Sequence, residues 1–147
     1  MSGPGAEQES ERLRAFRAAT EKLLEAFNEG DYERAFSGSS EDLEQIFPKG
    51  FVQDRLVGRR AVIKFFEEFR DDVGKWRLTP TEYLEAGPET FIVGYEAQGI
   101  GQTTGIASGF EEWDVIEVDS EGRTRRIRQF WDRDEALAAA AERESAA

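Results

Sequence analysis

The stretch SGFEEWDVIEVDSEGRTRRIRQFWD, residues 108–132, predicts the architecture of the second half of the chain. Its two arms, Ser108–Val118 and Arg123–Trp131, are rich in β-branched and aromatic residues, which favour strands. Between them, residues 120–122 (SEG) provide the composition of a tight turn. The stretch is therefore predicted to form an antiparallel hairpin.

The first arm of this hairpin has two acidic residues on one face. In a strand Glu112 and Asp114 share a face, while Trp113 and Val115 share the other. A carboxyl group in an apolar cavity has a raised pKa, which suits acid–base chemistry. Asp114 is therefore the candidate catalytic residue, and Glu112 is a candidate ligand-binding residue. The alternative is that both acids lie at a solvated mouth, or pair with arginines of the second arm.

In the second arm a single amide lies between apolar residues. Ile127, Gln129 and Trp131 share one face of the predicted strand. This pattern suggests a polar group placed inside a pocket, although a hydrogen-bonded glutamine in a packed core would show the same pattern.

Outward from the hairpin, the preceding residues predict two more strands and the following ones a helix. Trp76–Glu85, interrupted by Pro80, and Thr90–Gly101 have strand composition. From Asp132 the sequence DEALAAAAERESAA is helical in character.

The first half of the chain has helical periodicity. From Glu9, apolar residues recur at spacings of three and four until Gly30, which is placed to end the helix with a positive φ. Asp31 is predicted to cap a short helix through Phe36. Ser39 and Asp42 suggest another helical turn, by a capping-box arrangement.

A second long helix is predicted after a short extended piece. Residues 52–57 are expected to be extended, and Gly58 precedes a helix with a buried stripe of Val62, Phe65, Phe66 and Phe69. Helices first and an antiparallel meander afterwards predict an α+β domain. Residues 1–8 are expected to form a loose tail, and residues 141–147 a frayed end.

Composition excludes several kinds of chemistry. The chain of 147 residues has a net charge of −12 and contains neither cysteine nor histidine. A Ser-His-Asp triad, a thiol nucleophile and the commonest zinc ligands are therefore excluded, and we expect no metal and no cofactor. Nucleic acid is an unfavourable partner for so acidic a chain. The absence of a long apolar run and of a secretory-type N-terminus favours a cytoplasmic protein without a membrane span.

An ordered set of short motifs resembles the SnoaL-like domain of the nuclear transport factor 2 superfamily. The set runs over residues 9–140 and comprises AFNEGDYERAF, a Gly-Arg-Arg before a Phe-rich helix, Trp76-Arg77, Ala86-Gly87-Pro88, the Glu-Gly turn and FWDRDEAL at 130–137. The resemblance implies a cone, with helices packed on a strongly curved, mixed and mostly antiparallel sheet around a pocket. It also implies a homodimer formed through the outer face of the sheet.

The resemblance further implies which residues face the pocket. Compared with ketosteroid isomerases, Leu23 occupies the place of the oxyanion tyrosine, Phe47 that of the base, and Asp114 that of the proton-sharing aspartate. Compared with limonene-type epoxide hydrolases, Gln129 replaces the water-activating aspartate. The predicted ligand-binding residues are Leu23, Phe47, Phe66, Phe69, Glu112, Ile127, Gln129 and Trp131.

Three functions fit these features. The first is a SnoaL-like protein that binds a small, largely apolar organic molecule. The second is a cyclase, isomerase or hydratase that uses Asp114 as general acid or base. The third is a non-catalytic dimeric interaction module whose outer sheet face, including Trp113 and Val115, docks a partner.

Overall fold

The computed structural model describes residues 9–99 and 109–146. The expected tail at 1–8 and the last residues of the strand expected to reach Gly101 lie outside the described residues. The elements are α2 (Glu11–Glu29), α3 (Tyr32–Ala35), β1 (Ser39–Ile46), β2 (Arg55–Val57), α4 (Arg59–Val73), β3 (Trp76–Gly87), β4 (Thr90–Gly99), β5 (Phe110–Val118), β6 (Thr124–Phe130) and α5 (Arg133–Ala146).

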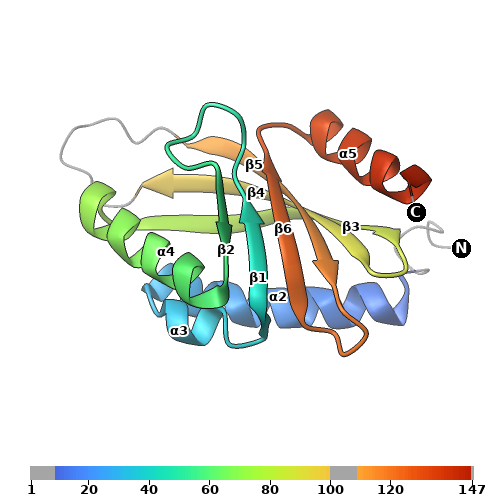
Figure 1. Cartoon of the computed structure of the whole chain (residues 1–147), viewed down its shortest axis with the longest axis horizontal. Helices are drawn as coiled ribbons and strands as arrows, with labels where there is room; N and C mark the ends of the chain where they lie inside the picture. Colours follow the sequence, from blue (N-terminus) through green and yellow to red (C-terminus); the bar gives the residue numbers. More distant parts are fainter. Residues whose placement is uncertain (1–8, 100–108, 147) are drawn as a thin grey trace, which may run out of the picture.

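The strands form one mixed sheet of six in the order β2-β1-β6-β5-β4-β3 (Figure 1). The pair β1–β6 is parallel, and the other neighbours are antiparallel. The predicted hairpin is confirmed as β5–β6. Its turn closes through Gly122, whose φ of 81° favours glycine, and the backbone N–H of Gly122 donates to the carbonyl of Asp119.

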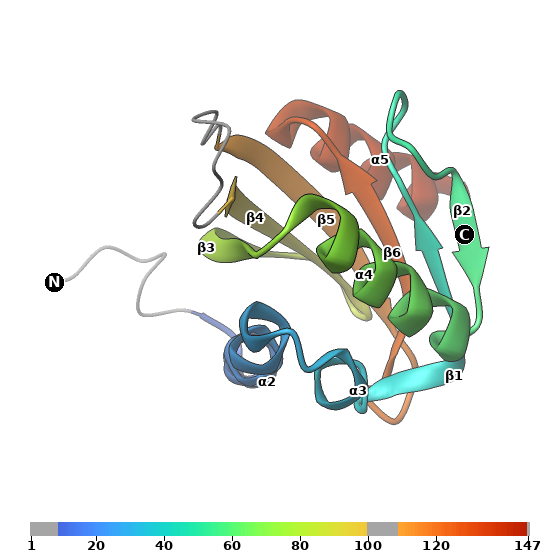
Figure 2. The same cartoon turned by 90° about the vertical axis from the view of Figure 1, so that its left-hand side faces the viewer.

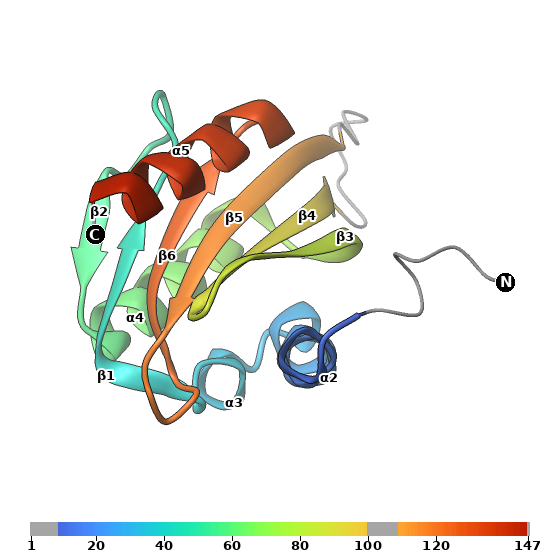
Figure 3. The same ribbon diagram turned by 90° about the vertical axis from the view of Figure 1, so that its right-hand side faces the viewer.

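Helices lie on both faces of this curved sheet. Helices α2, α3 and α4 lie on the concave face, and α5 lies against the convex face (Figures 2 and 3). The larger apolar cluster joins the concave-side helices to the sheet, and a smaller one lies beneath α5. The predicted α+β class is therefore confirmed, as an open, cone-like arrangement.

The ends of the first helices follow the predicted capping chemistry. The hydroxyl of Ser10 accepts a hydrogen bond from the N–H of Leu13 and caps the start of α2. Gly30 ends α2 with a φ of 85°, and Asp31 caps α3 by accepting from the N–H of Arg34. These bonds fix where the chain leaves α2 and enters the sheet.

The helical turn predicted at Ser39 and Asp42 is wrong, because this segment is strand β1. The hydroxyl of Ser39 donates instead to the carbonyl of Phe36 at 2.6 Å, and Asp42 hydrogen-bonds with Ser40. Pairing with β6 and burial of Leu43 and Gln45 outweigh that local preference. Only Arg55–Val57 of the expected extended piece forms a strand.

The convex face is not free at the residues expected to dock a partner. Trp113 and Val115 are buried in a cluster with Ala136 and Ala140 of α5. The expectation that these two residues contact another molecule is therefore wrong. Helix α5 continues to Ala146, so it includes most of the segment expected to be a frayed end.

Within the described residues, no helix is long and apolar enough to cross a membrane.

Candidate functional site

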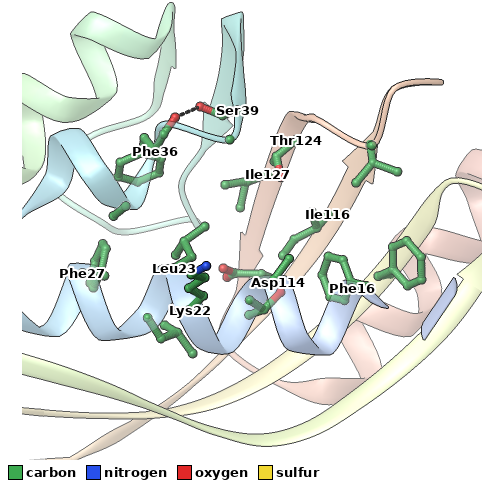
Figure 4. Close-up of a pocket in the computed structure, with 18 of the residues that line it drawn as sticks. Phe16, Lys22, Leu23, Phe27, Phe36, Ser39, Asp114, Ile116, Thr124 and Ile127 are labelled. Carbon is green, nitrogen blue, oxygen red and sulfur yellow. Dashed lines mark hydrogen bonds between the residues drawn. The ribbon is translucent and has the colours of Figure 1, made fainter. Parts of the chain in front are cut away.

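A cavity of about 900 Å³ lies between the concave face of the sheet and helices α2 and α3. Side chains from both layers line it, and Figure 4 shows Asp114 and Ile116 from the sheet opposite Leu23 of α2. Pockets of this volume are typical of sites for small organic molecules.

Aromatic rings make up much of the cavity wall. The lining includes Phe16, Phe27, Phe36, Phe66, Trp76, Phe91 and Tyr95. Many of these rings are in contact: Phe16 stacks on Phe91 with centroids 4.2 Å apart, and Phe27 meets Trp76 edge-on at 5.4 Å. Because the rings pack against each other, the wall can stay open without collapsing into the cavity.

The polar part of the cavity comes from three neighbouring strands. Register pairs Tyr95 of β4 with Glu112 of β5, and Asp114 of β5 with Gln129 of β6. All four side chains line the cavity. Glu112 and Asp114 are 4% and 7% exposed, so both carboxyl groups are removed from bulk water.

Burial is the main influence on these carboxyl groups. It raises the pKa of Asp114 well above its usual value, and the adjacent Glu112 raises it further. Burial also raises the pKa of Glu112, although hydrogen bonds from Asp114 and Gln129 oppose that rise. The two groups therefore titrate together, as a carboxyl pair that shares a proton.

Two buried acceptor atoms in the cavity lack a hydrogen-bond partner among the residues that the structure describes. Among the described residues, Oδ1 of Asp114 and Oε1 of Gln129 form no hydrogen bond. A buried polar atom without a partner costs about 1–3 kcal/mol. Such atoms are expected where a ligand or water supplies the missing donor.

Arginines do not neutralise the carboxyl pair. Arg126 and Arg128 point to the convex face, where they approach Glu117 at 3.5 and 3.8 Å. Arg126 also donates to Glu44 at 2.9 Å. The alternative in which these arginines pair with Glu112 or Asp114 is therefore wrong, because strand alternation sends the two sets of side chains to opposite faces.

Six of the nine predicted site residues line the cavity: Leu23, Phe66, Glu112, Asp114, Ile127 and Gln129. Phe47, Phe69 and Trp131 do not. Phe47 and Phe69 pack around Phe51, with ring centroids 5.1 and 5.8 Å from that of Phe51. They lie behind the cavity wall, since Phe47 contacts Phe66 and Phe69 contacts Trp76. Trp131 lies beyond the end of β6, is 38% exposed, and donates from its indole N–H to the carbonyl of Lys49.

Sequence reasoning missed other residues of the cavity. Tyr95 and Gln45 are both buried and line it, from β4 and β1. Alternation along Thr90–Gly99 would have placed Tyr95 on one face, but which face is concave depends on pairing with β5. Gln45 could not be found, because β1 was expected to be partly helical. Phe16 and Thr20 also line the cavity, from the apolar face of α2 that carries Leu23.

No group of acidic side chains within residues 9–99 and 109–146 has the arrangement needed to hold a metal ion.

A curved, open sheet with helices on its concave face and a hollow between them is the cone-like fold of solved structures described as nuclear transport factor 2-like. Residues 20–127 match the SnoaL-like domain family, and the chain belongs to that family. The resemblance found in the sequence motifs is thereby confirmed.

Solved structures show the same fold at low sequence identity. TerC, co-crystallised with polyporic acid, superposes with a TM-score of 0.68 and 19% identity, covering 86% of this chain and 97% of that one. A putative polyketide cyclase from Xanthomonas campestris pv. campestris gives 0.62 and 18%, covering 88% and 98%. SalBIII, an epoxide hydrolase/cyclase-like enzyme in pyran ring formation in the polyether salinomycin, gives 0.65 and 18%, covering 82% and 93%. Among curated proteins no sequence matches.

Proposed function

We propose that this SnoaL-like protein binds a small, largely apolar organic molecule in the cavity between α2 and the sheet. The observation that carries the proposal is a cavity of about 900 Å³ with aromatic walls and unpartnered oxygens of Asp114 and Gln129. A few polar groups in an apolar hollow orient a ligand, while the walls supply affinity. Similarity to proteins named as a polyketide cyclase and an epoxide hydrolase/cyclase-like enzyme supports a ligand of that general kind.

Native mass spectrometry of protein purified from its own host tests this proposal. We expect a co-purified organic molecule that leaves on denaturation. Leu23→Trp fills the cavity and should abolish the adduct, whereas Leu137→Trp, the same change on α5, should retain it. An adduct unaffected by Leu23→Trp would overturn the proposal.

A second candidate function is catalysis by the carboxyl pair. Two neighbouring carboxyl groups with raised pKa values can serve as proton donor and proton acceptor, and Asp114 faces the cavity. In this alternative the protein is a metal-independent cyclase, isomerase or hydratase, with Asp114 as general acid or base.

Deuterium exchange at the carbon next to the carbonyl of tetralone, followed by NMR, tests this second candidate. The native protein should accelerate exchange, and Asp114→Asn should remove the acceleration while leaving the circular dichroism spectrum unchanged. Glu111→Gln, an exposed acid on the same strand, is the matched control. Equal rates with the native protein and Asp114→Asn would rule out the carboxyl mechanism for this reaction.

A further inference from the structure

The charge inside the cavity limits which ligands it can accept. Glu112 and Asp114 are buried side by side, and the influences that shift the pKa of Asp114 are burial and Glu112 rather than a cation. Tyr95, from the neighbouring strand, keeps its proton because burial and both acids raise the pKa of its hydroxyl. The interior therefore holds acids without a countercharge from the described side chains.

The cations that line the cavity lie towards solvent. The outer part of the cavity is lined by the basic residues Arg12, Lys22 and Arg34 and by the acidic residues Glu25, Glu89 and Asp119. All of them except Asp119 belong to exposed residues, and Asp119 is engaged by Arg123. Basic and acidic side chains are therefore equal in number at the outer part of the cavity, whereas the ionisable carboxyl groups described in the interior are acidic.

The unpartnered atoms indicate the complementary group. Oδ1 of Asp114, on a side chain more than nine-tenths buried, and Oε1 of Gln129 belong to residues that adjoin in register. Both are acceptor oxygens in the described geometry. A ligand group that donates two hydrogen bonds would therefore satisfy both.

The surrounding rings favour a positively charged donor. The face of an aromatic ring attracts a cation, and seven of the lining residues are aromatic. The net charge of −12 also attracts cations to the protein from a distance.

We propose that the ligand of this cavity is an amine whose ammonium group binds between Asp114 and Gln129 while its apolar body contacts the aromatic walls. This inference rests on the proposed function, because it requires that the cavity binds an organic molecule. It goes further by specifying the charge of that molecule. The cavity selects positively charged ligands and excludes negatively charged ones.

Calorimetric titration with naphthylethylamine, naphthylethanol and naphthylacetate tests the inference, because the three probes share an aromatic body and differ in charge. We expect the amine to bind about 10- to 100-fold more tightly than the alcohol, the usual range for a charge-assisted hydrogen bond in a buried site. The carboxylate should bind least. Affinity for the amine should rise with pH through the titration of the carboxyl pair, because the ammonium competes with the shared proton.

The double change Glu112→Gln and Asp114→Asn should bring the affinity for the amine close to that for the alcohol, because it removes both buried acids, and Glu111→Gln should leave the preference intact. Each variant's melting temperature shows whether it is folded. Tight binding of the alcohol without preference for the amine would overturn this inference and leave the proposed function standing. Failure of all three probes to bind the folded protein would contradict both.

Discussion

At the scale of single residues, the most unusual feature is the placement of Glu112 and Asp114. Apolar side chains at both positions would be compatible with the pairing of β5 in the sheet. Instead, two carboxyl groups are buried together, and one of their oxygens has no hydrogen-bond partner within residues 9–99 and 109–146. Groups that lower stability in this way are expected at functional sites, where a ligand or a reaction makes use of them.

The pair makes a prediction about stability and pH. Burial raises the pKa of Asp114 in the folded state above that of an exposed aspartate, so the folded protein binds more protons than the unfolded chain. Its contribution is favourable at low pH and is lost as pH rises from about 4 through the raised folded-state pKa. Asp114→Asn should remove this dependence and raise the free energy of unfolding at pH 7 by about 1 kcal/mol.

Urea unfolding of both proteins across a pH series measures this effect. Glu111→Gln, which alters an exposed carboxyl group on the same strand, should leave the pH dependence of the native protein unchanged. Parallel pH curves for the native protein and Asp114→Asn would contradict the account of the pair.

At the scale of secondary structure elements, one side chain holds α2 over the cavity. The amide of Asn28 donates to the carbonyl of Leu78 at 3.0 Å, and its oxygen accepts from the N–H of Leu78 at 2.9 Å. Strand β3 is an edge strand, so its outward backbone groups need such a partner. Asn28 therefore fixes the end of α2 to the edge of the sheet.

Asn28→Ala should lower the free energy of unfolding by about 1–3 kcal/mol, because two half-buried backbone groups lose their partners. It should also weaken ligand binding, since α2 forms one wall of the cavity. Glu29→Ala, which removes an exposed ion pair with Arg34, should cost less than about 1 kcal/mol. Urea titrations compare the two variants, and equal small losses would show that the Asn28 bonds do not stabilise the fold.

On the opposite face, a glycine allows the sheet to pack against α5. Gly94 pairs with Trp113, and a Cβ atom at Gly94 would lie 2.5 Å from the indole ring. The ring is therefore flat against the backbone of β4, in the cluster that α5 covers.

Gly94→Ala should destabilise the protein by about 1–3 kcal/mol, because Trp113 must move within a packed cluster. Gly38→Ala is the matched control, since a Cβ atom there meets nothing within 4 Å. Thermal unfolding followed by tryptophan fluorescence would report both changes. A Gly94→Ala protein as stable as Gly38→Ala would contradict the described packing of Trp113.

The elements differ in how well the sequence predicted them. Helices α2 and α4 and the β5–β6 hairpin carry their periodicity and turn residues locally, so they could be predicted. Strand β1 could not, because its identity depends on a parallel pairing with β6, about 80 residues away. Alternation within the hairpin was enough to place Asp114 and Gln129 on the cavity side. Phe47, which was expected in the pocket from the resemblance alone, does not line the cavity.

At the scale of the whole molecule, the sheet separates two differently filled regions. Beneath α5 the convex side is packed, whereas beneath α2 the concave side is hollow. On part of the convex face, ion pairs join three strands. Glu44 of β1 pairs with Arg55 of β2 and with Arg126 of β6. Among the described elements α5 contacts β3 to β6, so β1 and β2 lie beyond its main contacts.

We propose that a homodimer forms through this β1–β2–β6 part of the convex face. Sedimentation equilibrium over a range of protein concentrations should give the dimer mass. Val57→Asp, at a residue of β2 that is 56% exposed, should shift the mass towards the monomer because it places a charge in the contact. A native protein that stays monomeric at all concentrations would refute the dimer.

NMR can show whether a ligand enters the cavity between α2 and the sheet. With methyl-labelled protein and bound naphthylethanol, we predict nuclear Overhauser contacts from the ring to the methyl groups of Leu23, Ile116 and Ile127, which line the cavity from both layers. Val52 and Val57, which are exposed outside it, should show none. Contacts confined to those two valines would contradict a binding cavity between α2 and the sheet.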